Sequence, residues 1–359
     1  MKPSLAQAWA NQIAYCDANA SPFTARVLDA AWADRAAGGA LAALLPDWPG
    51  DAWADAVPLR VAGALHALAL SGAEPALAAL YPPARAAFDP HRGPAMVAAA
   101  VAHHQQTLRD YLARAPQTNE IGRSAVLLGG FACIARATRL PLATLEVGAS
   151  AGLNQLWHRY RYELGGTRWG DSTSPVHMAS DWQGGAPPLP AQIDVASYAA
   201  CDVSPIDLAE PGAALRLASY VWADQRERLA RLQAAIALAQ RLGVAVERAD
   251  ALAWSTTALA TPRRGRTTVI YHSVMWQYMP QATRDSLHAC IAAAGARATH
   301  DAPLAWLALE PPAGSANPEL VLTLWPGGER RLLAEAHPHG RWVRWAGTAP
   351  TAPGRGRPT

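Results

Sequence analysis

The chain has 359 residues, of which 51% are hydrophobic and 16% are charged, and its formal net charge is +3. This composition supports a sizeable core and excludes a disordered chain, and the positive charges form no dense block of the kind that binds nucleic acid. No uninterrupted apolar run reaches roughly 18 residues and no signal pattern is present, so we expect a cytoplasmic protein without a membrane span. Lys2 is the only lysine, which excludes Schiff-base and phosphate-loop lysine chemistry.

Residues 1–140 are rich in alanine and leucine and are divided by prolines, so we expect an all-helical N-terminal region. Helices are predicted near residues 4–18, 22–45, 51–71, 73–80, 93–115 and 119–138. His103 and His104 lie in one of them, but adjacent residues of a helix point about 100° apart and do not share a metal easily. We therefore predict no metal site.

From residue 141 onward, short apolar runs alternate with helical segments. This alternation predicts an α/β fold, a Rossmann-like domain over residues 141–347 with a mostly parallel, doubly wound sheet. Strands are expected near residues 142–147, 193–202, 244–251, 267–273, 304–310, 320–325 and 341–345, and helices near 153–160, 211–242 and 282–295. Glycines and tryptophans in residues 161–190 predict an insertion of short strands, and we expect the tail 348–359 to be disordered.

The first of these strands runs into a glycine turn. Gly148 and Gly152 let the backbone turn sharply and approach a ligand, and amides at the start of the next helix suit a carboxylate or a phosphate. Four interpretations compete: the Glu-x-Gly-x-x-x-Gly pattern of class I methyltransferases, a Gly-x-Ser-x-Gly nucleophile elbow at Ser150, a dinucleotide turn, and an ordinary strand-to-helix turn. The dinucleotide turn is the weakest, because Ser150 stands where that motif needs a glycine.

Polar side chains stand where several predicted strands end, namely Glu146, Asp202, Asp250 and His272. In open parallel sheets, ligands lie beyond the carboxyl ends of the strands. This alignment favours a nucleotide-like cofactor, with Asp202 accepting hydrogen bonds from the ribose hydroxyls. A helix cap for Asp202 and a core histidine for His272 stay open as structural interpretations.

A serine hydrolase is the first alternative, because Ser150, Asp250 and His337 or His339 follow one another in an order that a catalytic triad can have. However, a hydrolase elbow normally follows several strands, and only helices are predicted before Leu142. No oxyanion segment precedes the turn either. The second alternative is a noncatalytic protein that binds S-adenosylmethionine (SAM) or another nucleotide and lacks acceptor chemistry.

Five blocks of sequence carry a family resemblance: Gln117–Glu120, Leu145–Asn154, Tyr220–Gln225, His272–Tyr278 and Leu324–Gly328. Together they resemble an uncharacterised bacterial family, domain of unknown function 2332, over nearly the whole chain. The sheet half is in turn similar to SAM-dependent class I methyltransferases. That similarity rests on three short motifs: Glu146-x-Gly148-x-x-x-Gly152, Asp202-x-Ser204-Pro205 and Ala249-Asp250-Ala251. The middle glycine common in those enzymes is Ser150 here.

The methyltransferase resemblance implies SAM as the cofactor, no metal, and a small molecule as the methyl acceptor. Gly148 and Gly152 would hold the methionine part, with Glu146 orienting either the loop or the amino group of the cofactor. Asp202 would bind the ribose and Asp250 the adenine. The full set of expected cofactor-binding residues is Glu146, Gly148, Ser150, Gly152, Asn154, Asp202 and Asp250.

The resemblance also implies where the acceptor lies. His272 would face the acceptor and act as a base where the acceptor carries a proton, since the reference pKa of histidine lies near neutrality. Trp276 and Tyr278 would wall the acceptor pocket, although ordinary core aromatics are the alternative. Asn119 and Arg123 belong to a polar loop that we expect to face the site and bind substrate. Neither nucleic acid nor a membrane is expected as a partner.

Overall fold

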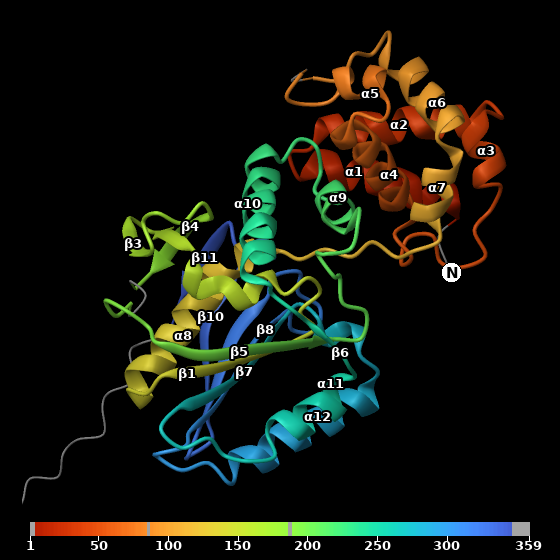
Figure 1. Cartoon of the computed structure of the whole chain (residues 1–359). Helices are drawn as coiled ribbons and strands as arrows, with labels where there is room; N and C mark the ends of the chain where they lie inside the picture. The colour runs from red at the N-terminus through yellow and green to blue at the C-terminus, as the bar shows by residue number, and fades with distance from the viewer. Residues whose placement is uncertain (1–3, 85–86, 186–188, 347–359) are drawn as a thin grey trace, which may run out of the picture. The chain divides into compact units, whose positions relative to one another are not determined.

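The computed structural model describes residues 4–84, 87–185 and 189–346. By its internal contacts the chain forms two compact units (Figure 1). The helical unit comprises residues 1–118 and 209–233, and the sheet unit comprises residues 119–208 and 234–359. The helical unit is therefore discontinuous in sequence. The tail 348–359, for which we expect disorder, lies outside the described residues.

The helical unit is built around α4. Its helices are α1 Leu5–Ala18, α2 Pro22–Ala36, α3 Ala40–Leu44, α4 Val57–Ser71, α5 Pro75–Leu80, α6 Gly93–His103, α7 Gln105–Leu112 and α9 Ala213–Ser219. In α4, most residues from Val57 to Leu68 are buried, as expected for an apolar helix with neighbours on all sides. The helix predicted over 22–45 is broken at Gly38, whose φ of +77° does not belong to a helix. The helix predicted over 93–115 is likewise divided, at His104.

Residues 209–233 supply the N-terminal cap of α2. Ser21, which stands at the cap position, makes no side-chain cap hydrogen bond. Instead, the Asp224 carboxylate accepts hydrogen bonds from the backbone N–H groups of Phe23 (2.8 Å) and Thr24 (3.0 Å). It also accepts from the Thr24 hydroxyl at 2.6 Å. A carboxylate at this position satisfies amides that have no partner within the helix and complements the helix dipole.

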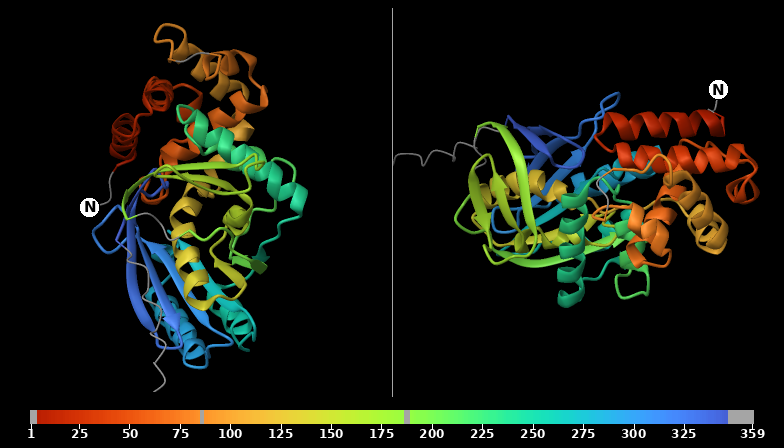
Figure 2. Two further views of the ribbon diagram at one scale, coloured as in Figure 1. Left: turned by 90° about the vertical axis from the view of Figure 1, so that its left-hand side faces the viewer. Right: turned by 90° about the horizontal axis from the view of Figure 1, so that it is seen from above.

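The sheet unit contains one mixed sheet with the strand order β3-β2-β4-β11-β10-β9-β8-β7-β1-β5-β6. The strands are β1 Leu142–Val147, β2 Arg161–Leu164, β3 Thr167–Gly170, β4 His177–Gly184, β5 Val195–Asp202, β6 Glu247–Arg248, β7 Thr267–Ser273, β8 Leu304–Glu310, β9 Glu319–Trp325, β10 Glu329–Ala336 and β11 Trp342–Trp345. Figure 2 shows the blue strands of the C-terminal half side by side. The prediction of an α/β fold with a large, mostly parallel sheet after a helical N-terminal region is confirmed.

Five neighbouring strands, β6, β5, β1, β7 and β8, are all parallel. When they are numbered by their order in the chain, their order in the sheet is third, second, first, fourth, fifth. The chain therefore leaves β1 toward β5 on one side and later returns to place β7 on the other side. In open α/β sheets, ligands bind beyond the carboxyl ends of the strands at a switch point of this kind.

Helices cover both faces of this part of the sheet. α8 Ser124–Thr138 packs on one face, where Phe131 meets Tyr271 and where a Cβ on Gly130 would lie 2.4 Å from Leu307. α11 Ala251–Ala258 and α12 Gln281–Gly295 pack on the other face, and Leu287 joins Ile270 in the core there. Among the described residues, Ile121–Thr138 is the one stretch long and apolar enough to cross a membrane, but 72% of it is buried inside the structure. It therefore has the burial of a core helix.

The remaining elements show where the sequence prediction and the structure differ. They are α10 Arg226–Leu242 and the 3-10 helices η1 Ile121–Arg123, η2 Leu153–Arg159 and η3 Trp276–Tyr278. The single helix predicted over 211–242 is two helices, α9 and α10, and the strand predicted over 244–251 is reduced to the two residues of β6. The sequence does not predict β10, because its first three residues, Glu329 to Arg331, are charged. The insertion over 161–190 contains β2, β3 and β4, and its residues 186–188 lie outside the described part.

Candidate functional site

The turn after β1 has an unusual backbone. Gly148, Ser150 and Gly152 all have positive φ, at +70°, +54° and +73°. A Cβ on Gly148 would lie 2.9 Å from side-chain atoms of Met275, and a Cβ on Gly152 would lie 2.5 Å from Gln155. A glycine is therefore required at both positions for two reasons, namely the positive φ and the lack of room for a Cβ beside the neighbouring side chain.

Asp202, at the end of β5, holds the turn in place. Its Oδ2 accepts a hydrogen bond from the Ser150 amide (2.8 Å), and its Oδ1 accepts one from the Ser204 amide (2.8 Å). The carbonyl of Cys201 accepts from the amides of Gly148 and Ala149, at 2.9 and 3.1 Å. Asp202 is only half-buried, and each carboxylate oxygen has two lone pairs, so its capacity to accept further hydrogen bonds is not exhausted.

Ser150 carries a buried hydroxyl without a partner. The residue is 6% exposed, and its Oγ has no hydrogen-bond partner among the described residues. No histidine is therefore in place to activate it as a nucleophile. Asp250 instead caps α11 by accepting at Oδ1 from Leu252 and Ala253, and the His337 ring accepts from the amide of His339 at 3.0 Å. The geometry gives no support to a triad at Ser150.

Glu146 lies beneath the turn, with 2% of its surface exposed. The Tyr271 hydroxyl donates to its Oε2 at 3.2 Å. Burial raises the pKa of Glu146 to about 8, because desolvation penalises the charged form more than the Tyr271 hydrogen bond favours it. Glu146 is therefore mainly a neutral carboxylic acid at pH 7.

The polar loop before α8 is bonded to the turn. The Asn119 side chain accepts from the Leu153 amide at 2.9 Å. Ser124 donates to the Asn154 side chain at 2.7 Å. Arg123 donates to the carbonyl of Ser273, at the end of β7, at 3.2 Å. Asn119 and Asn154 thus lie beside the turn, whereas Arg123 contacts the end of β7. These bonds go to the protein itself, and substrate binding by Asn119 and Arg123 stays a prediction.

A pocket of about 560 Å³ lies on the α12 face of the sheet. It contains two of the residues predicted from sequence, His272 and Trp276, whereas Tyr278 is 78% exposed and does not line it. Sequence reasoning missed most of the polar and aromatic lining: His288, Trp306, Glu310, Glu319, Trp325 and Arg330. The signal that could have found part of it is the alternation of Trp306, Ala308 and Glu310 on β8, which places the three side chains on one face.

His272 is fixed by two partners inside this pocket. Its Nδ1 lies 2.7 Å from Glu310, and the indole N–H of Trp306 donates to its Nε2 at 3.0 Å. Because an indole nitrogen only donates, Nε2 accepts and the ring proton sits on Nδ1. The ring of Trp276 stacks on the imidazole at 4.9 Å. The lone pair that a base would use is therefore engaged by Trp306.

The segment after β7 joins the turn to the pocket. Val274 has φ of +51°, a strained backbone for a β-branched residue. Met275 packs against Gly148, while Trp276 lines the pocket. Glu310 accepts from the amides of both, at 3.1 and 3.2 Å. Non-glycine residues with positive φ, Ser150 and Val274, thus follow two adjacent central strands, β1 and β7, which makes this place a candidate site.

A family model describing uncharacterised proteins conserved in bacteria, DUF2332, matches residues 6–345. The chain belongs to this family. The match extends through the helical unit, the turn and the pocket, as the resemblance of the five sequence blocks predicts. No curated protein and no solved structure was found to match the chain.

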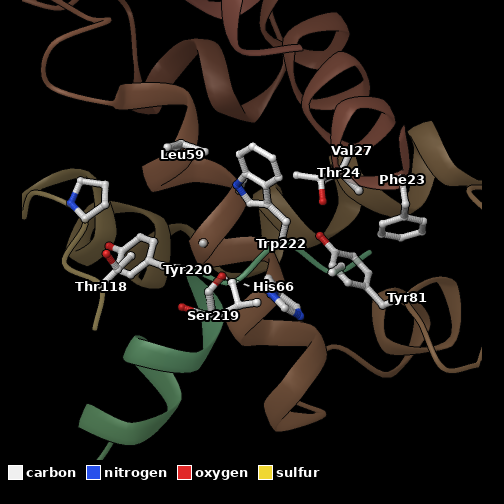
Figure 3. A pocket seen from close by; sticks show the side chains of 15 residues that line it. Phe23, Thr24, Val27, Leu59, His66, Tyr81, Thr118, Ser219, Tyr220 and Trp222 are labelled. Carbon is white, nitrogen blue, oxygen red and sulfur yellow. Dashed lines mark hydrogen bonds between the residues drawn. The ribbon is translucent and has the colours of Figure 1, made fainter. Parts of the chain in front are cut away.

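The helical unit of this DUF2332 protein contains a second, smaller pocket of about 50 Å³, which has room for water. Figure 3 shows its lining, with Trp222 at the centre and His66 beside Ser219. His66 Nδ1 lies 3.1 Å from the Ser219 carbonyl, which only accepts, so Nδ1 is the protonated nitrogen. Burial lowers the pKa of His66 to about 4, and the imidazole stacks on Tyr81 at 5.5 Å. This histidine is a neutral core residue.

Proposed function

We propose that this DUF2332 protein binds SAM at the glycine turn and transfers its methyl group to a small molecule. The observation that carries the proposal is the placement of the turn at the switch point of the parallel strands, with Asp202 at the end of the adjacent strand. Doubly wound, Rossmann-like sheets bind nucleotide-like cofactors at this position. The strand order of β6, β5, β1, β7 and β8 supports such a domain.

The residues of the turn fit the cofactor. The half-buried Asp202 has lone pairs left for the two ribose hydroxyls, and the unpartnered Ser150 hydroxyl is suited to the polar methionine end. Asp250 is exposed at the start of α11 and would meet the adenine edge. Glu146 lies beneath the turn, so its role is to support the loop. When bound, the cofactor would supply an activated methyl group on a positively charged sulfur.

The pocket lined by His272 and Trp276 would hold the acceptor. Methyl transfer needs mainly an aligned approach of two groups, and positioning supplies most of the rate. Met275 packs against the turn and Trp276 lines the pocket, so consecutive residues connect the two places. His272 would accept a proton only after an acceptor displaces the Trp306 indole from Nε2.

A noncatalytic SAM-binding protein is the second candidate. The observation that favours it is the engagement of both ring nitrogens of His272, which leaves no ready base. The two candidates share the cofactor site and differ in turnover.

Calorimetry with SAM and S-adenosylhomocysteine tests the shared part. We expect micromolar binding by the wild-type protein. Asp202→Asn should weaken it at least tenfold, and Ser150→Ala, which removes no internal hydrogen bond, should weaken it several-fold. The control is Asp181→Asn, an exposed aspartate on β4. Absence of binding of either molecule to folded wild-type protein would overturn the proposal.

A further inference from the structure

The pocket on the α12 face has the size and lining of a small-molecule site. Its volume of about 560 Å³ lies within the range of known ligand pockets, roughly 300–1,000 Å³. Three half-buried tryptophans line it, Trp276, Trp306 and Trp325. The rings of Trp276 and Trp306 lie 5.7 Å apart and are inclined by 45°, so they present faces in different directions.

Two glutamates stand directly opposite each other at one end of this pocket. Glu310 on β8 and Glu319 on β9 are partners in the antiparallel ladder, and both line the pocket. Like charges directly opposite each other in a sheet are destabilising, so this pairing is unfavourable unless a positive charge compensates the repulsion. Glu310 contacts the neutral His272 and two backbone amides, none of which carries a positive charge.

Glu319 is left without a charge partner. No hydrogen bond or ion pair of its side chain is found among the described residues, although Glu335, its other neighbour in the ladder, pairs with Arg344. Arg330 lines the pocket but is opposite Thr323, four residues along β9 from Glu319. Four residues of a strand span about 13 Å, so Arg330 marks the opposite end of the pocket.

We propose that this pocket binds an organic ammonium ion. The apolar body of the ligand would pack on the tryptophan rings, whose faces attract cations, and its head group would lie between Glu310 and Glu319. A cation there removes the repulsion between the two carboxylates, whereas an anion would add to it. The site does not depend on the cofactor. Only the further step, that such an amine is the methyl acceptor, rests on the proposed function.

The test uses three probes with the same benzyl body and different charge: benzyltrimethylammonium, benzyl alcohol and phenylacetate. Each is titrated into the full-length protein without SAM, followed by tryptophan fluorescence and calorimetry. We expect the cation to bind at least tenfold more tightly than the alcohol, and phenylacetate to bind most weakly. Equal affinities for the cation and the alcohol, or no binding of any probe, would overturn the proposal.

Two variants locate the binding. Glu319→Gln removes one charge and leaves the neighbouring side chains in place. It should weaken the affinity for the cation at least fivefold and leave the affinity for benzyl alcohol unchanged. Glu329→Gln, an exposed glutamate at the start of β10 that pairs with Arg331, is the matched control and should change nothing. An unchanged cation affinity in Glu319→Gln would contradict the assignment. Because SAM is absent, failure of cofactor binding and failure of this site are measured separately.

Discussion

Glu146 is a buried carboxyl group whose protonation links stability to pH. Its ordinary pKa is near 4.5, and burial raises the value in the folded protein to about 8. Between these values the folded state binds more protons than the unfolded state, so the unfolding free energy falls as pH rises through this window. At 1.36 kcal/mol per pKa unit, the loss is at most about 5 kcal/mol.

Glu146→Gln should remove this pH dependence. The amide stays neutral and its oxygen can still accept from Tyr271, so we expect higher stability than the wild type at pH 9 and similar stability at pH 5. Urea unfolding at pH 5, 7 and 9 measures the difference. Glu163→Gln on β2, at a half-exposed carboxylate, is the control. A parallel loss of stability with pH in Glu146→Gln and wild type would show that another group is responsible.

At the scale of elements, the turn after β1 packs against the segment after β7, with the Met275 side chain lying directly on Gly148. Gly148→Ala should lower the unfolding free energy by about 2–4 kcal/mol, because it combines a positive φ with a steric overlap. Adding Met275→Ala provides space for the new methyl group. The double variant should therefore be more stable than the sum of the two single effects by about 1 kcal/mol or more.

A second glycine separates the cost of the positive φ from the cost of the steric overlap. Gly265 has φ of +75°, and a methyl group added there would have no neighbour within 4 Å, so Gly265→Ala shows the cost of φ alone. Urea unfolding of the four variants gives the comparison. Strict additivity of Gly148→Ala and Met275→Ala would contradict the fit between these two elements.

The elements that the sequence predicts well are those whose signal is local. β7 has the β-branched and aromatic centre Val269-Ile270-Tyr271, β8 is apolar up to its last residue, and their predicted bounds, 267–273 and 304–310, match the structure. The pocket is not predictable as a whole, because Glu310 and Glu319 meet only through the register of two antiparallel strands. That register depends on the turn between the strands and on the packing of their faces, neither of which residue spacing reveals.

The same limit applies to the candidate site. The glycine turn is predictable because its motif lies in one short stretch of the chain. The sequence singles out both Ser150 and Asp202, but it does not show that the carboxylate binds the turn amide. Nor does it show that Trp306 donates to His272, since 34 residues separate them. Hydrogen bonds between distant residues are set by the folded chain.

For the molecule as a whole, the division into two units has a measurable consequence at Asp224. Asp224→Ala removes three hydrogen bonds from the start of α2 and should lower the unfolding free energy of the helical unit by about 1–2 kcal/mol. Asp29→Ala, on the exposed side of the same helix, should cost much less. Hydrogen exchange of α2 peptides gives the readout within that unit, and equal protection in the two variants would contradict the role of Asp224.

The cap from Asp224 also bears on how the protein is made. A ribosome releases α2 long before it adds residue 224, so the helix emerges without the carboxylate that secures its first turn. The helical unit stays unfinished while β1 to β5 are being synthesised, and the part of α4 that packs against α9 and Tyr220 lacks its partner during that time. Folding of the newborn chain is therefore not simply N-terminal domain first. A messenger RNA truncated in the part that encodes β1 to β5 would yield a chain with an incomplete helical unit. Such a chain is a natural substrate for chaperones and proteases.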